Sequence, residues 1–405
     1  MAKVKAFSCI RPEASVAAKV AALPYDVYDR KEAKAAVEGQ PLSFLNIDRP
    51  ETQYGEDFDM YSQKAYETAR DMLAAEIADG TFIVDPDEAY YLYELMMNGR
   101  VQTGIVALCS IEDYKNDVIK KHENTLAAKE EDRINHIRYC GYQTGPIFLA
   151  YRRNNRLTQI IMETKYSDPL YAFIGKDRVG HRVWKIDRIY NDDIEKSFEG
   201  IGEIYIADGH HRAASAVKVG ASDDGFLSVL FAEDDLKILP YNRALKDLNG
   251  MTEKAFLGKL EELFEIEKSD ESVMPGKKGE VGMFIAGRGE ESQEKGWYRL
   301  TVKPQYASID PVGGLDVSIL QNNVLGPMLG IDDPKTNSRI SFIGGIRGNE
   351  ELERLVNECG YAVAFSMYPT TIDDLMSIAD SKKIMPPKST WFEPKLRSGL
   401  FVHTV

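Results

Sequence analysis

The feature that most constrains the fold is the segment from Gly202 to Gly220, which reads GEIYIADGHHRAASAVKVG. Its apolar run predicts a buried strand, and the alanine-rich stretch that follows predicts a helix ending at Gly220. The two elements meet at Asp208-Gly209, where the glycine permits a sharp turn. Because the first backbone N–H groups of a helix have no partner inside it, this junction predicts an anion-binding site.

Polar side chains crowd this junction. Arg212 is permanently charged and can hold a phosphate through two parallel hydrogen bonds, with His210 and His211 as further donors. Asp208 could bind Mg²⁺ or orient one of the histidines. The plainer alternative is an N-cap aspartate followed by two solvent-facing histidines. Adjacent histidines on a helix point about 100° apart and rarely reach one ion, which disfavours a transition-metal site.

A second polar cluster begins at Lys120 with the sequence KKHENT, which contains His122 and Glu123. It continues into a predicted helix over 125–139, whose polar residues recur at steps of three and four and would share one face. This stripe fits either a binding surface or a solvated face held by ion pairs. HENTL lacks the second histidine of a zinc-protease motif. The residues of the stripe are Thr125, Lys129, Asp132, Arg133 and His136.

Two loop segments carry further candidate residues. Asp26 lies in LPYDV before a predicted helix, where it would act as a base or simply as the carboxylate of a helix N-terminal turn. Near the C-terminus, the segment MPPKSTWFEPK begins with tandem prolines, which favour an extended chain. Its Lys388, Ser389 and Thr390 could close over an anion, or the segment could be a tail that packs Trp391 and nearby apolar residues onto the body.

Composition narrows the class of partner. The 405 residues include 50 Lys and Arg against 64 Asp and Glu, a net charge of -14, which disfavours a broad nucleic-acid surface. No run of 18 apolar residues predicts a membrane span, and the opening MAKVKAFSCIRPE does not read as a signal peptide. Four widely spaced cysteines without a CxxC pair are typical of reduced thiols. We therefore expect a cytoplasmic protein.

The order of predicted elements indicates a mixed α/β fold in two domains, 1–248 and 249–405, the second returning its tail to the site of the first. We predict helices over 30–38 and 56–78, a hairpin turning at Asn98-Gly99, and a turn over 153–156 after the strand PIFLAY. Alternating helices and strands follow residue 249. The chain has no GxxxxGK[ST] phosphate loop, no GxGxxG fingerprint and no GxSxG elbow.

Four motifs in order suggest a family: LPYDV, KKHENT with KEEDR, IADGHHR, and PPKSTWFEPKLRSGL. Together they resemble the bacterial and archaeal family known as domain of unknown function 1015, over nearly the whole chain. ADGHHR also resembles the phosphate-binding box of the ParB/sulfiredoxin superfamily, in which a strand-turn-helix binds nucleotide phosphates. Some members of that superfamily are kinases of free L-serine that use ATP or ADP.

The resemblance implies roles for the residues that match. Asp208, Gly209, His210, His211 and Arg212 would bind the transferred phosphate, and Asp26 would replace the general-base glutamate of the serine kinases. His210 and His211 would assist the catalysis. The resemblance also implies that residues of this family's own motifs line the nucleotide site. These are His122, Lys129 and Arg133, with Lys388, Ser389 and Thr390 from the tail. Asp208 and Glu123 would help bind Mg²⁺ with ATP or ADP.

These observations favour a small-molecule kinase, with free L-serine as the first acceptor. Phosphoryl transfer needs positioning and charge neutralisation more than covalent chemistry, which suits a site of this composition. A nucleotide-binding regulatory protein of the ParB-like type is one alternative. A hydrolase acting on a phosphate ester is the other.

Overall fold

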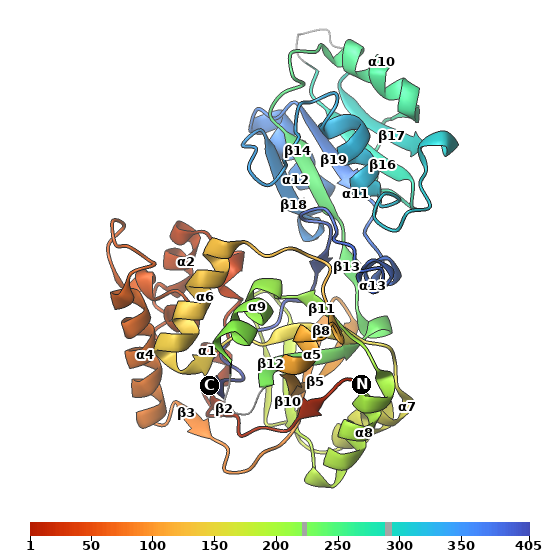
Figure 1. The fold of residues 1–405 in the computed structure, drawn as a ribbon. Coiled ribbons are helices and arrows are strands. Elements are labelled where there is room, and N and C mark those ends of the chain that lie inside the picture. The colour runs from red at the N-terminus through yellow and green to blue at the C-terminus, as the bar shows by residue number, and fades with distance from the viewer. Residues whose placement is uncertain (221–224, 288–293) are drawn as a thin grey trace. The chain divides into compact units, whose positions relative to one another are not determined.

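The computed structural model describes residues 1–220, 225–287 and 294–405, which form two compact units (Figure 1). The first unit comprises Met1–Leu236 with Pro394–Val405, and the second comprises Lys237–Glu393. The predicted division after residue 248 lies further along the chain than this one. The second unit begins earlier because β13 (Ile238–Leu239) and β14 (Tyr241–Leu245) pair with later strands of that unit.

The end of the chain belongs to the first unit because its backbone pairs with the N-terminal segment. Ser398 and Ala22 exchange two hydrogen bonds, of 2.9 and 3.2 Å, and Val402 exchanges bonds of 2.8 and 3.0 Å with Ile10. β21 (His403–Thr404) also pairs with β7 (Tyr142–Gln143). None of the helices in the described ranges has the length and apolar character that a membrane crossing requires.

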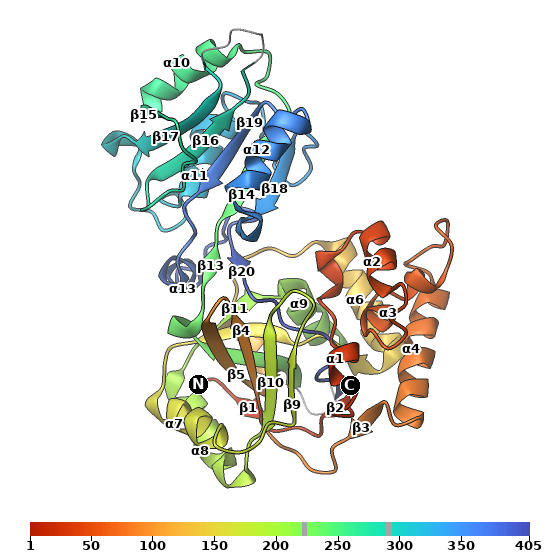
Figure 2. The ribbon, with the colours of Figure 1, turned by 180° about the vertical axis from the view of Figure 1, so that it is seen from behind.

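The first unit is built on a nine-stranded mixed sheet within its described residues (Figures 1 and 2). The strand order is β6-β11-β8-β12-β5-β4-β10-β9, with β1 paired to β5. β11 runs parallel to β6, β12 runs parallel to β8, and the other neighbours are antiparallel. The strands are β1 (Val4–Lys5), β4 (Tyr91–Met97), β5 (Arg100–Ser110), β6 (Ile119–Lys120), β8 (Ile147–Tyr151), β9 (Tyr171–Ile174), β10 (Gly180–Lys185), β11 (Ile204–Asp208) and β12 (Gly225–Ala232).

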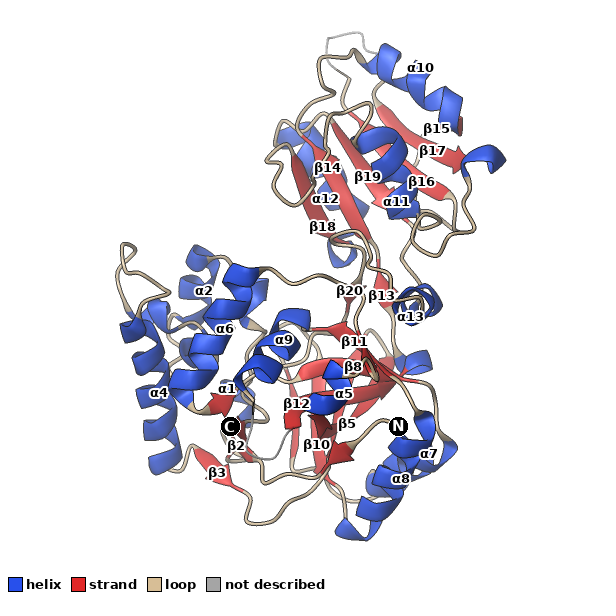
Figure 3. Cartoon of the chain, viewed as in Figure 1, coloured by secondary structure: helices blue, strands red, loops and turns tan. Residues whose placement is uncertain are grey.

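Two groups of helices accompany this sheet (Figure 3). α6 packs between α4 and α9, and α7 packs against α8. β2 (Ile10–Pro12) and β3 (Phe82–Val84) form a separate pair beside the first group. The helices are α1 (Ala17–Val20), α2 (Arg30–Val37), α3 (Leu45–Asp48), α4 (Gln63–Ala78), α5 (Ile111–Lys115), α6 (Ala127–Cys140), α7 (Asn155–Thr164), α8 (Asn191–Ile201) and α9 (His210–Val219), with single turns at η1 (Tyr25–Val27), η2 (Pro50–Gln53), η3 (Arg188–Tyr190) and η4 (Glu233–Asp235).

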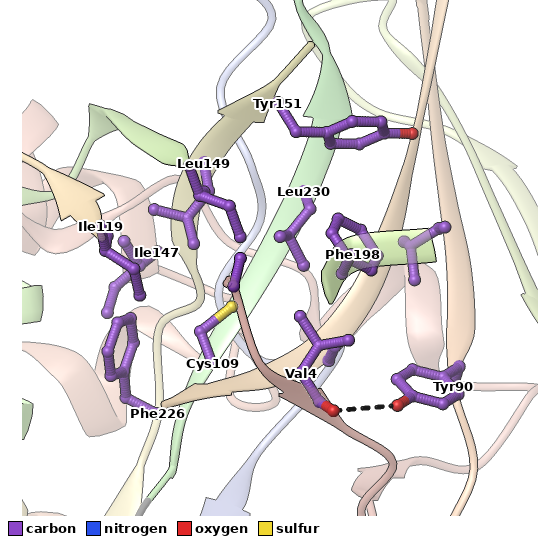
Figure 4. Close-up of a cluster of buried hydrophobic side chains, with 14 of the residues drawn as sticks. Val4, Tyr90, Cys109, Ile119, Ile147, Leu149, Tyr151, Phe198, Phe226 and Leu230 are labelled. Atoms are coloured by element: carbon purple, nitrogen blue, oxygen red, sulfur yellow. Dashed lines mark hydrogen bonds between the residues drawn. The ribbon is translucent and has the colours of Figure 1, made fainter. Parts of the chain in front are cut away.

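The main core lies between the sheet and its covering helices. Figure 4 shows part of it, where Leu149 and Leu230 of adjacent strands pack near Phe198 of α8. The Tyr90 hydroxyl is buried there and donates a hydrogen bond to the Val4 carbonyl oxygen (3.3 Å), so its polar end is satisfied. A second apolar cluster holds the N-terminal helices together through Phe44, Leu45, Ile47, Leu73 and Phe82.

The second unit contains a six-stranded antiparallel sheet among its described residues, in the order β15-β17-β16-β19-β14-β18. Its apolar cluster includes Phe284, Trp297 and Leu352. The remaining elements are β15 (Phe264–Ser269), β16 (Glu280–Ile285), β17 (Gly296–Val302), β18 (Ile340–Gly344), β19 (Val363–Met367), β20 (Trp391–Phe392), α10 (Glu253–Leu263), α11 (Asp316–Leu320), α12 (Gly348–Glu358), α13 (Ile372–Asp380), η5 (Pro304–Tyr306), the π-turn η6 (Gln321–Leu325) and η7 (Gly345–Arg347).

Two predicted elements differ from the structure. The helix predicted over 56–78 begins only at Gln63, because the Ser62 side chain caps it by accepting from the Ala65 N–H (3.4 Å). The prediction of a turn over 153–156 is wrong for its second half, because α7 already begins at Asn155. The Asn154 side chain accepts from the Leu157 N–H (3.1 Å) and so starts the helix.

The hairpin prediction is confirmed. Asn98 and Gly99 have φ values of 51° and 78°, as the expected turn requires, and join β4 to β5. The mixed α/β class with a large mixed sheet is also confirmed.

Candidate functional site

The strand pairing brings two of the predicted motifs together. β6 lies parallel to β11, with Tyr205 opposite Lys120, so the residues that follow β6 lie beside the start of α9. His122 and His210 meet there with their ring centroids 4.4 Å apart and their planes nearly perpendicular, at 86°. The KKHENT and ADGHHR motifs, separated in sequence, therefore form one structural feature.

The two histidines are buried and electrically neutral near pH 7. Burial lowers the pKa of His122 to about 4, and burial together with the nearby His122 lowers the pKa of His210 well below its ordinary value. The His122 backbone N–H donates to Nε2 of His210 (3.5 Å), which leaves Nδ1 of His210 facing the Glu123 carboxylate at 3.8 Å. His210 is therefore not the solvent-facing side chain of the plainer alternative.

His122 is exposed by only 1%. Neither of its ring nitrogens makes a hydrogen bond of ordinary geometry within the described part of the chain, although the Ile206 backbone acts to raise its pKa. Buried polar atoms without partners are uncommon, since each forfeits its hydrogen bonds to water. Among the described residues, the His122 ring is therefore held in this junction by at most a weak contact to the Ile206 backbone.

Asp208 and Arg212 define the charge at the turn. Burial alone would raise the pKa of Asp208, but Lys395 and Arg212 lower it to about 2, so the carboxylate stays ionised. Its Oδ2 atom lies 3.6 Å from Nζ of Lys395 and 3.4 Å from Nη2 of Arg212. Arg212 also donates from Nη1 to the Pro146 carbonyl oxygen (2.6 Å), and its Nε is buried without a hydrogen bond in the described residues.

Gly209 allows this arrangement. It has a φ of 95°, and a Cβ atom there would lie 3.0 Å from both Nε and Nη2 of Arg212. A side chain at this position would strain the backbone and push the guanidinium away. The glycine is thus needed for the turn and for the close approach of Arg212.

The LPYD segment is held beside α6. Arg49 donates from Nη1 to the carbonyl oxygens of Tyr25 (3.0 Å) and Tyr28 (2.9 Å), and its Nε pairs with Glu51 at 2.6 Å. The Arg133 guanidinium lies over the Tyr25 ring, 4.0 Å from its centroid. These contacts fix η1, which carries the exposed Asp26.

The polar stripe of α6 is not a solvated face. Arg133 and His136 are exposed by only 7% and 1%, and His136 contacts the Ile47 carbonyl oxygen through Nε2 at 3.0 Å. Lys129 remains exposed. The helix starts at Ala127, so Thr125 precedes it, and its hydroxyl pairs with the Glu130 carboxylate instead. The solvated-face alternative is therefore wrong for the inner part of this stripe.

Two cavities join the motifs. One of about 240 Å³ is lined by Asp26, Lys129 and Asp132, among others. A second of about 30 Å³ is lined by Arg212, His136 and Ser398, among others. The walls of both cavities include Tyr25, Asp48 and Arg133. The LPYD segment, α6 and the start of α9 thus surround adjoining spaces.

Asp48 was missed by the sequence reasoning. It ends α3 with 1% exposure and accepts a hydrogen bond from the Thr144 hydroxyl (2.8 Å). The available signal was weak: an acidic residue directly after Leu45-Asn46-Ile47 and before Arg49-Pro50. Nothing in the local pattern distinguishes such a carboxylate from an ordinary helix-end residue.

The C-terminal motif is divided between the units. Lys395 and Ser398 belong to the first unit and contribute to the site as described. Lys388, Ser389 and Thr390 belong to the second, where Nζ of Lys388 lies 5.4 Å from the centroid of the Tyr241 ring. Their role at a phosphate stays a prediction.

His211 and the metal ligands also stay predictions. Nε2 of His211 accepts a hydrogen bond from the Leu126 N–H (3.0 Å), so this ring supports the start of α6. In the described ranges, no group of three or more His, Cys, Asp and Glu side chains is placed to hold a metal ion. Mg²⁺ bound to phosphates commonly uses only one or two protein carboxylates. The two predicted ligands, Asp208 and Glu123, both interact with His210.

Comparison with known proteins places the chain in a family. Residues 4–318 match the family described as "Protein of unknown function (DUF1015)", and the chain belongs to it. The family predicted from the motifs is thereby confirmed, and the first three of the four motifs lie within the matched residues. No curated protein matches the chain.

Several solved structures are distantly similar. One is a conserved hypothetical protein from Pyrococcus furiosus, 15% identical, with a TM-score of 0.36, covering 74% of this chain and 95% of that one. Another is a free serine kinase in complex with AMP, 16% identical, with a TM-score of 0.36, covering 75% and 91%. A third is SbnI with a C-terminal truncation from Staphylococcus aureus, 11% identical, with a TM-score of 0.39, covering 74% and 87%.

Proposed function

We propose that this chain is a small-molecule phosphotransferase that moves a phosphoryl group from a nucleotide to a hydroxyl acceptor, with free L-serine as the first acceptor to test. The observation that carries the proposal is the pair of adjoining cavities, one walled by Arg212 and the other by Asp26, with Arg133 in both. Phosphoryl transfer needs a cationic phosphate site next to a group that can take a proton from the acceptor.

The phosphate side of the site would be formed at the start of α9. The helix N-terminus and Arg212 would hold phosphate oxygens, and the His122 ring, whose nitrogens have no protein partner of ordinary geometry among the described residues, would add a hydrogen bond. Asp208 and Glu123 would hold Mg²⁺ on the nucleotide phosphates. We extend to this unit the ParB/sulfiredoxin-like assignment that the ADGHHR box suggested.

The acceptor side would lie in the larger cavity. The acceptor oxygen forms a bond to phosphorus as the bond between phosphorus and the leaving nucleotide oxygen breaks, and Asp26 accepts the hydroxyl proton. The nucleotide departs with the electron pair of the broken bond. Arg49, through its two bonds to the backbone of the LPYD segment, would keep Asp26 at the cavity.

The experiment incubates the pure protein with L-serine, Mg²⁺ and ATP, ADP or pyrophosphate, and measures O-phosphoserine by ³¹P NMR and mass spectrometry. We expect product with a nucleotide donor. Arg212→Ala should lower the rate by at least about a hundredfold, within the range for removing one charge-stabilising group. The matched control is Arg138→Ala, an exposed arginine on α6, which should leave the rate unchanged.

The outcomes separate the alternatives. If no phosphorylated product forms from serine, threonine or another hydroxyl acceptor with any of the donors, the proposed phosphotransferase activity is refuted. Nucleotide binding without product would then favour the regulatory protein. Release of inorganic phosphate from a phosphate ester without an acceptor would favour the hydrolase.

A further inference from the structure

Asp48 presents an unusual carboxylate. It is almost completely buried, and its Oδ1 atom accepts from the Thr144 hydroxyl at 2.8 Å. Its Oδ2 atom is also buried, yet it has no hydrogen-bond partner among the described residues. Asp48 is among the residues that line both cavities of the site. A buried anionic oxygen without a partner is costly unless a ligand supplies one.

Arg133 presents the complementary group. Its Nε and Nη2 atoms pair with Asp132 at 2.9 and 2.7 Å, and the guanidinium plane lies on the Tyr25 ring. Its Nη1 atom makes no hydrogen bond within the described chain, and Arg133 lines the same two cavities as Asp48. A guanidinium held on two sides and open on the third is oriented to receive a carboxylate.

Asp48 and Arg133 attract each other electrostatically but do not form a direct ion pair. Asp48 contributes, with Asp132 and Tyr25, to keeping Arg133 protonated against the effect of its burial on its pKa. In the part of the chain that the structure describes, however, no nitrogen of Arg133 comes within 4.0 Å of an Asp48 oxygen. Arg133 is compensated by Asp132, whereas the buried Asp48 carboxylate has no positively charged partner at that distance among the described residues.

We propose that these two residues recognise the α-amino acid part of the acceptor, Asp48 binding its ammonium group and Arg133 its carboxylate. A zwitterion is the ligand that completes both charges at once. The larger cavity, of about 240 Å³, also contains Asp26, so the hydroxyl of a small hydroxy amino acid would face the base. This volume is well above the roughly 10–15 Å³ that one water molecule needs in a cavity, enough for a ligand of serine's size.

The proposal rests on the proposed function and adds the class of acceptor to it. A polyol or a hydroxy acid would leave Oδ2 of Asp48 unpaired, and an amino alcohol would leave Arg133 unpaired. Sites that hydrogen-bond a ligand group reject analogues lacking that group, because the buried partner stays unsatisfied. Asp48 and Arg133 would thus determine specificity, while Asp26 and Arg212 act on the reacting atoms.

The test is calorimetric binding to the full chain without nucleotide. The probes are L-serine, L-glycerate, which has a hydroxyl in place of the ammonium, and ethanolamine, which lacks the carboxylate. We expect serine to bind at least about tenfold more tightly than either analogue. Asp48→Asn preserves the shape and the acceptor for Thr144, and should weaken serine at least about tenfold while leaving glycerate unchanged.

A second variant and a control complete the experiment. Arg133→Lys, which keeps the charge but not the fork, should weaken serine and glycerate while leaving ethanolamine unchanged. Glu131→Gln, at an exposed position of α6, should bind all three probes as the natural protein does. Circular dichroism on each variant separates loss of binding from loss of folding.

The outcomes distinguish this inference from the proposed function. Asp48-dependent serine binding without O-phosphoserine formation would support the inference and refute the serine kinase. Phosphorylation of serine with an unchanged KM in Asp48→Asn would support the kinase and overturn the inference. The inference is also overturned when serine, threonine and homoserine all fail to bind, or when glycerate binds as tightly as serine.

Discussion

The buried His122 imidazole should make the first unit sensitive to acid. It is exposed by 1%, and burial lowers its pKa to about 4. In the unfolded chain its pKa returns to the ordinary value of 6.5. Between these two values the unfolded state binds the proton and the folded state does not, so stability falls as the pH falls.

The size of the effect follows from the two pKa values. The difference between 6.5 and about 4 is roughly 2.5 units, and each unit corresponds to about 1.36 kcal/mol. His122 should therefore contribute a loss of about 3 kcal/mol to the free energy of unfolding. The loss is absent above pH 6.5, grows as the pH falls and is complete near pH 4.

The assay compares the natural protein with His122→Asn and His122→Phe, neither of which titrates. Urea unfolding is followed by circular dichroism between pH 7.5 and 4, with hydrogen exchange assigning the transition to peptides of the first unit. The variants differ from each other in size and polarity, so they should differ in stability at pH 7.5. Both should nevertheless lose about 3 kcal/mol less than the natural protein on acidification.

The neighbouring titratable groups, Asp208 and His210, are present in all three proteins. Because His122 also lowers the pKa of His210, removing His122 should reduce the acid-induced loss through both rings, so about 3 kcal/mol is the smallest difference expected. Parallel stability curves for the natural protein and both variants would refute the reasoning. They would mean that the imidazole titrates alike in both states, so that burial does not set its pKa. Direct NMR titration of the His122 ring should give a value near 4 and provides an independent check.

Two further predictions concern packing. Gly104→Ala should destabilise the first unit by about 1–3 kcal/mol, because the new Cβ would lie 2.5 Å from Cγ1 of Val229. Gly55→Ala, which has open space around it, should be nearly neutral in the same urea titration. Equal effects of the two substitutions would contradict this prediction. Iodoacetamide at pH 8 should modify the exposed Cys359 in the native protein, whereas the buried thiols should react only after unfolding, since burial raises their pKa values. Mass spectrometry identifies the modified sites. Modification of a buried thiol at the same rate as Cys359 would contradict the burial. The buried cysteines are Cys9, Cys109 and Cys140.

Local signals in the sequence predicted much of the framework. Asn98-Gly99 predicted its hairpin because both residues readily adopt the positive φ values that this turn requires. The strand and helix meeting at Asp208-Gly209 were predicted for the same reason, since both depend on short-range patterns. The helix over 56–78 was predicted too long because an apolar spacing of three and four does not reveal that Ser62 begins the helix.

The sequence predicted the candidate site only in part. The sequence singled out Arg133 and His122, but it left open whether α6 faced solvent, since a polar stripe looks alike in either case. The packing of α6 between α4 and α9 decided this, and it buried Arg133 and His136. Asp48 carried only a weak local signal, because what distinguishes it is the missing hydrogen-bond partner of Oδ2, and that is a property of the folded structure.

The sequence by itself determined the turn at Gly209, the basic and acidic groups around it, and the family to which the chain belongs. Each of these depends on residues that are neighbours in the chain. The tertiary structure decided that β6 lies along β11, which puts His122 against His210, and that Asp48 and Arg133 share a cavity. Contacts between distant segments depend on strand pairing and helix packing, and no local pattern of residues encodes those distances.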